Sequence, residues 1–122
     1  MAAAILIMLA GLMGAGGVIL AAAGAHAAPG AGLDSAATML LFHAAAVLGG
    51  AALMREGALA QPWILVVLFA WVVGAALFSG DVALRAFAGH RLFPLAAPTG
   101  GFVLIAAWLG LAAVAVAAMV RG

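Results

Sequence analysis

Four long runs of apolar residues, three of them without a charged side chain, constrain this 122-residue chain more than any other feature. A soluble domain carries about 25% charged residues. Here only 6% of the residues are charged and 70% are hydrophobic. Such a chain has too little polar surface to cover itself in water, and about 20 apolar residues are enough to cross a bilayer as a helix. The pattern predicts an all-α fold, an integral membrane four-helix bundle.

The expected spans form a single domain over residues 1–122. Their limits are set by turn residues and cover residues 3–25, 35–54, 62–88 and 99–120. Asp34 or Ser35 is expected to cap the second helix, and Thr99 the fourth, because such side chains accept hydrogen bonds from free N–H groups. The first span resembles a secretory signal peptide, but it lacks a basic leading region and is too long for one. We expect it to be retained.

Four spans place both termini on one side of the membrane, which we call face A. The connections near residues 26–34 and 89–98 then lie on the other side, face B. Arg55 and Arg121 belong to face A, and Arg85 and Arg91 to face B. The even distribution of arginines gives no orientation by the positive-inside rule.

Most polar side chains of the spans are expected near face B. At 1.5 Å per residue, Asp81 lies roughly 28 Å from the start of its span, close to the boundary of the apolar layer. His26, Ser79 and Thr99 belong to the same end of the bundle, whereas His43 lies roughly 12 Å deeper. These five residues form the candidate polar site.

Asp81 and Arg85 are four residues apart and therefore share one helix face. We expect a local ion pair, with Arg85 reaching toward the headgroups. Two alternatives are a contact between Asp81 and His26 across helices, and a site for a proton or cation. The sequence leaves two roles open for His43: it forms structural hydrogen bonds, or it acts as a ligand or proton site.

Several classes of function find no support in the sequence. The chain has no cysteine, no His-x-x-x-His pair and no paired carboxylates within a span, so we expect no metal and no cofactor. A net charge of +1 without a basic stripe argues against nucleic-acid binding. No nucleophile–histidine–acid set or phosphate-binding loop occurs, and we therefore expect no enzymatic activity.

Four motifs resemble a known family. They are GAGGVILAAAGAHA, FHAAAVL, LFSGDVALRAFAG and PLAAPTGGFVLIAAWLGLA, in this order over about residues 10–115. Together they are similar to the small four-span membrane family filed as domain of unknown function 423, which includes transmembrane protein 256-like members. The resemblance implies a four-helix membrane fold and no assigned activity.

The resemblance places particular residues in family motifs. It implies that His26, His43 and Ser79 occupy shared elements, together with the Pro98–Gly101 segment. Asp81 and Arg85 depart from the pattern, which usually has a small polar residue and an apolar residue there. The departure favours a local role for the pair.

We expect a structural or accessory protein of a bacterial inner membrane that packs with itself or with a larger membrane complex. Its many small residues serve either packing within the chain or such an interface. One alternative is a small transporter or channel with a polar vestibule near His26 and His43. Another is a lipid or quinone binder, with His26 and Arg91 meeting the head group.

Overall fold

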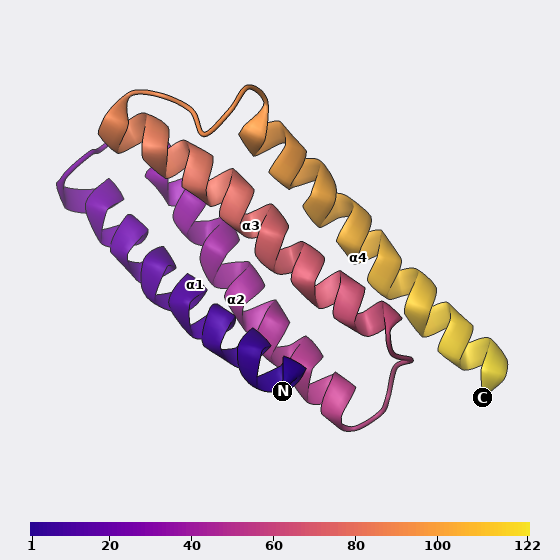
Figure 1. Ribbon diagram of the computed structural model, residues 1–122. Coiled ribbons are helices and arrows are strands. Elements are labelled where there is room, and N and C mark those ends of the chain that lie inside the picture. The colour runs from indigo at the N-terminus through magenta and orange to yellow at the C-terminus, as the bar shows by residue number, and fades with distance from the viewer.

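The computed structural model describes residues 1–122 and consists of four α-helices joined by short connections (Figure 1). The helices are α1 (Ala2–His26), α2 (Leu33–Arg55), α3 (Trp63–Ala88) and α4 (Ala96–Arg121). All four are long and apolar enough to cross a membrane. The predicted all-α, four-helix membrane bundle is therefore confirmed.

The helices run alternately up and down. Figure 1 shows the N-terminus, the C-terminus and the α2–α3 connection at one end of the molecule, with the other two connections at the opposite end. Close backbone contacts join α1 to α2, α2 to α3, α3 to α4, and α1 to α3. Helix α4 therefore makes close backbone contact with α3 alone and forms one edge of the bundle.

Glycines bring the helices together at two of these contacts. A Cβ atom on Gly17 of α1 would lie 2.6 Å from the Leu41 side chain of α2. A Cβ atom on Gly100 of α4 would lie 2.7 Å from the Gly74 carbonyl oxygen of α3. Within a bilayer, where lipid tails remove the hydrophobic drive for association, such close approach provides packing energy.

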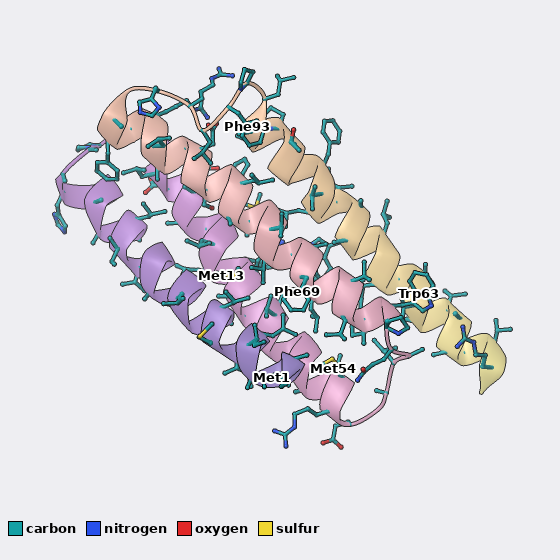
Figure 2. All side chains as sticks on the ribbon, viewed as in Figure 1. Met1, Met13, Met54, Trp63, Phe69 and Phe93 are labelled. Atoms are coloured by element: carbon teal, nitrogen blue, oxygen red, sulfur yellow. The ribbon has the colours of Figure 1, made fainter.

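The core lies between α1, α2 and α3, with a contribution from α4. It includes Leu6 and Met13 from α1, and Met54 from α2, all of them buried. Figure 2 labels Met13 and Met54 within this region of the bundle. Trp71 of α3 is the largest member of the core and is 2% exposed.

The expected helix caps were wrong. Helix α2 begins after Gly32, which adopts a left-handed conformation (φ 80°), and no side chain caps it. Helix α4 begins after Leu95 (φ 65°), again without a side-chain cap, so that Thr99 lies inside the helix. Backbone turns start both helices two or three residues early. Pro98 is tolerated because the first turn of a helix does not use its N–H groups.

Candidate functional site

Asp81 lies near the face B end of α3, where it is 1% exposed. Its Oδ2 atom is 3.3 Å from Nε of Arg85, one turn later, and the Arg85 side chain is 42% exposed. Its Oδ1 atom accepts a hydrogen bond of 2.9 Å from the backbone N–H of Leu92. The carboxylate therefore joins its own helix to the α3–α4 connection. Both oxygen atoms are used within the chain.

Ser79 lies two residues before Asp81 and is also buried. Its hydroxyl donates a hydrogen bond of 2.8 Å to the backbone carbonyl of Ala36. Because this carbonyl belongs to the first turn of α2, the bond links α3 to α2 near face B. A hydrogen bond between helices in a bilayer contributes about 0.6 kcal/mol on average.

The remaining predicted residues near face B do not join Asp81. The His26 side chain is exposed at the end of α1, and no hydrogen bond or ion pair connects it to the carboxylate. Thr99 is exposed on α4, where its backbone N–H bonds to the Leu95 carbonyl. The five candidate residues thus occupy separate places and do not line one vestibule.

His43 forms the centre of a different site, deeper in the bundle. Its Nδ1 atom is 2.8 Å from the Met39 carbonyl oxygen, and its Nε2 atom accepts a 3.1 Å hydrogen bond from Nε1 of Trp108. A carbonyl oxygen only accepts and an indole N–H only donates. The bonds therefore assign the neutral tautomer with the proton on Nδ1. Both ring nitrogens are used, one within α2 and one across to α4.

Three aromatic rings surround His43. The ring centroids of Trp71 and Trp108 are 4.3 Å apart, and the His43 ring lies 6.4 Å from Trp71 and 6.0 Å from Trp108. Phe42 contacts the His43 ring edge-on at 5.5 Å. We call His43, Trp71, Trp108 and Phe42 the aromatic cluster. His43 lies ten residues into α2, about 15 Å along it, and hence near the middle of the bilayer.

The indole N–H of Trp71 is buried and has no hydrogen-bond partner. An unpaired polar group in an apolar environment is costly and is rare in folded proteins. No motif in the sequence marks Trp71 or Trp108 as more than packing residues. Their positions far from either end of their spans were the available signal, because membrane tryptophans are enriched at the interfaces.

A groove of about 450 Å³ opens beside the aromatic cluster, between α2 and α4. It exists because α4 rests on α3 and makes no close backbone contact with α2. Its lining includes Thr38, His43 and Trp108 as the residues with polar atoms, and Phe42, Phe78 and Ile105 among the apolar ones. The volume falls within the range of small-molecule sites.

No three His, Cys, Asp or Glu side chains gather where they could hold one metal ion. Of the histidines, His43 has both ring nitrogens bonded within the protein. Ser79, His43 and Trp108 thus link neighbouring helices through hydrogen bonds of 2.8 to 3.1 Å.

These features define a small multi-pass membrane protein whose internal polar groups hold its helices together. The family model described as "Protein of unknown function (DUF423)" matches residues 20–101, more than half of the chain, and the chain belongs to this family. The match begins within α1 and ends within α4, inside the range of about 10–115 expected from the motifs. Comparisons with curated proteins and with solved structures gave no match.

Proposed function

We propose that this protein is a structural or accessory component of a bacterial inner membrane, without catalysis of its own, and that it packs with itself or with a larger membrane complex. The polar side chains of its spans support the proposal. Ser79, Asp81 and His43 bond to groups of the same chain. These side chains therefore stabilise the fold of the chain itself. The outer surface of the bundle remains available for contacts in the plane of the membrane.

The outer side of α1 is the surface that we expect to contact another molecule. Gly11 and Ala15 are exposed and one turn apart, and a Cβ atom on Gly11 would meet nothing within 4 Å. The space beside Gly17, by contrast, is occupied by the Leu41 side chain of the same chain. Pairs of small residues four positions apart allow two membrane helices to approach closely. Gly11 and Ala15 have no such partner within the chain.

Blue-native electrophoresis of gently solubilised membranes tests the proposal. The wild type should migrate as an assembly, and Gly11→Leu combined with Ala15→Leu should shift it to the monomer. The folded chain has room at Gly11, so this change leaves its own packing intact. Ala112→Leu, on the exposed side of α4, serves as the matched control and should behave as the wild type. A lone wild-type monomer under all mild conditions would overturn the proposal.

Cysteine cross-linking separates the two forms of the proposal. The chain has no cysteine of its own, so Ala15→Cys supplies a single thiol. Oxidation in native membranes should give a product of twice the mass if the protein packs with itself. A mixed product with another protein indicates a larger complex. No product at Ala15, with assembly retained by electrophoresis, would remove α1 as the interface.

A second candidate function is the binding of a neutral lipophilic ligand of the quinone class. The observation that favours it is the groove between α2 and α4, which is lined by the Phe42 and Trp108 rings and by Thr38, whose hydroxyl can donate a hydrogen bond. A planar ring with carbonyl oxygens can stack on aromatic side chains and accept hydrogen bonds.

Quenching of tryptophan emission by a decyl-substituted benzoquinone tests this second candidate. Quenching should saturate near one quinone per protein, and Gly101→Leu should abolish the saturable part, because Gly101 lines the groove and has open space at its Cβ position. Trp63→Phe is the control, since Trp63 lies outside this groove. Quenching that rises without saturation would reject the site.

A further inference from the structure

A second groove, of about 360 Å³, lies between the first half of α3 and the last half of α4. It is at the face A end of the bundle, far along both helices from the Gly74–Gly100 contact. Its lining includes Trp63 and Val67 from α3, and Gly110, Val114, Ala117 and Arg121 from α4. Figure 2 shows the labelled Trp63 beside this part of α4.

Small side chains on α4 create the groove. Ala113 and Ala117 lie one turn apart and line it, and neither fills the space left beside α3. Its lining is mostly apolar, and it runs from the face A ends of both helices to Gly110, which lies about 16 Å along α4 from Arg121 and hence at the depth of the lipid tails. The shape and the lining suit a hydrocarbon chain.

The groove has one charged lining residue, Arg121, at its face A end. The Asp81–Arg85 ion pair is the one salt bridge of the chain, so no carboxylate lies within 4.0 Å of the Arg121 guanidinium. Glu56 is the acidic residue of face A and lies on the α2–α3 connection. An arginine with free donors at a membrane surface is suited to bind a phosphate group.

Trp63 adds a second feature of a lipid site. Its side chain is 59% exposed at the start of α3. Tryptophan side chains at this level of a membrane protein lie among the headgroups and glycerol backbones of the lipids. The groove thus has an apolar wall, an interfacial ring and a cationic end, in the order in which a phospholipid presents its chain, glycerol and phosphate.

We propose that this groove binds an anionic phospholipid, with an acyl chain along Val67, Val114 and Ala117 and the phosphate at Arg121. Basic pockets between transmembrane helices bind anionic head groups in this way. One arginine near the surface favours an anionic lipid about fivefold over a zwitterionic one. The proposal does not depend on the proposed function, because it concerns α3 and α4 and not the outer side of α1.

Brominated lipids test the proposal, since bromine on an acyl chain quenches a tryptophan that it touches. The protein is reconstituted in phosphatidylcholine nanodiscs that contain a minor fraction of either brominated phosphatidylglycerol or brominated phosphatidylcholine. The contribution of Trp63 is the difference between the wild type and Trp63→Phe. We expect brominated phosphatidylglycerol to quench Trp63 several-fold more at the same fraction. Equal quenching by the two lipids would overturn the proposal.

Three variants assign the signal to the groove. Arg121→Gln should remove the preference for phosphatidylglycerol, whereas Arg91→Gln, at face B, should retain it. Ala117→Leu fills the groove and should reduce the quenching by phosphatidylglycerol to that by phosphatidylcholine. A preference that survives Arg121→Gln or Ala117→Leu, or that Arg91→Gln removes equally, would overturn the assignment. Circular dichroism verifies that each variant is folded, and an unchanged assembly in blue-native gels separates this result from the proposed function.

Discussion

The carboxylate of Asp81 lies where an unpaired charge would be costly, near the edge of the apolar layer and almost without exposure. Arg85 neutralises it, and the N–H of Leu92 occupies the other oxygen. Each bond has a different consequence. The ion pair makes the charge tolerable, and the hydrogen bond fixes the α3–α4 connection to the end of α3.

Removal of Arg85 alone should therefore be worse than removal of both charges. We expect Arg85→Leu to lower the free energy of unfolding by about 2 kcal/mol, because it leaves a buried carboxylate without its counter-ion. Asp81→Asn combined with Arg85→Leu should lose only about 1 kcal/mol, because the asparagine oxygen still accepts the Leu92 hydrogen bond. Unfolding in mixed detergent–SDS micelles measures both. An equal or larger loss in the double variant would contradict this account.

His43 and Trp108 give a second prediction at the residue scale. His43→Leu leaves the Trp108 N–H without an acceptor at a depth where lipid provides none, and should cost about 1 to 2 kcal/mol. Once Trp108→Phe has removed the donor, the same histidine change should cost less, by a coupling of about 1 kcal/mol. A double-mutant cycle in the same micelles measures the coupling, with Trp63→Phe as the control. Strictly additive losses would show that the hydrogen bond contributes nothing.

The depths of Asp81 and His43, and Arg85 as a partner of Asp81, could be expected from the sequence, but their partners on other segments could not. The fixed rise of a helix gives the depth of Asp81 and His43 directly. Depth does not say which direction a side chain faces, and these helices are apolar on every side, so no amphipathic pattern orients them. The Leu92 N–H comes from an irregular connection, and the Trp108 N–H from a part of α4 in which the neighbouring residues are all apolar. Both required the structure.

At the scale of the helices, the close contact between α3 and α4 depends on two glycines. Gly100 is buried against the backbone of α3, where a Cβ atom would lie 2.7 Å from both the Gly74 carbonyl oxygen and the Phe78 nitrogen. Neither atom can move without moving the helix. The adjacent Gly101 faces open space. The two neighbouring positions therefore separate the effect of packing from that of helix propensity.

We expect opposite results from alanine at these two positions. Gly100→Ala should destabilise the protein by about 1 to 3 kcal/mol, because α4 must move away from α3. Gly101→Ala should be neutral or stabilising by up to about 1 kcal/mol, because alanine is the better helix former. Thermal unfolding in one detergent compares them directly. A Gly100→Ala variant as stable as Gly101→Ala would contradict a close contact at Gly100.

Helix limits were predictable to within three residues, and the two largest differences, at the starts of α2 and α4, had one cause. Asp34, Ser35 and Thr99 have the side chains that cap helices most often. The structure starts both helices earlier, through left-handed turns at Gly32 and Leu95. A glycine before a helix is an accepted sign of such a turn, but a leucine with positive φ is uncommon. The start of α4 could not be predicted from residue preferences.

At the scale of the whole molecule, the alternating helices place every connection on a defined side of the membrane. The connections between α1 and α2 and between α3 and α4 share one end, and the α2–α3 connection lies with both termini at the other (Figure 1). The arginines do not bias this arrangement toward either orientation. The fold fixes which connections and termini share a side of the membrane, whichever way the protein is inserted.

Single cysteines report this sidedness without interference, since the chain has no cysteine. Ala31→Cys and His90→Cys should react with a membrane-impermeant maleimide from one side of sealed vesicles, and Ala58→Cys and Gly122→Cys from the other. All four positions are exposed and lie outside the helices, so the substitutions should leave the fold intact. Inverted vesicles must reverse the labelling of both pairs together, because the four helices cross as one unit. Labelling of Ala31→Cys and Ala58→Cys from the same side would show that α2 does not cross the bilayer.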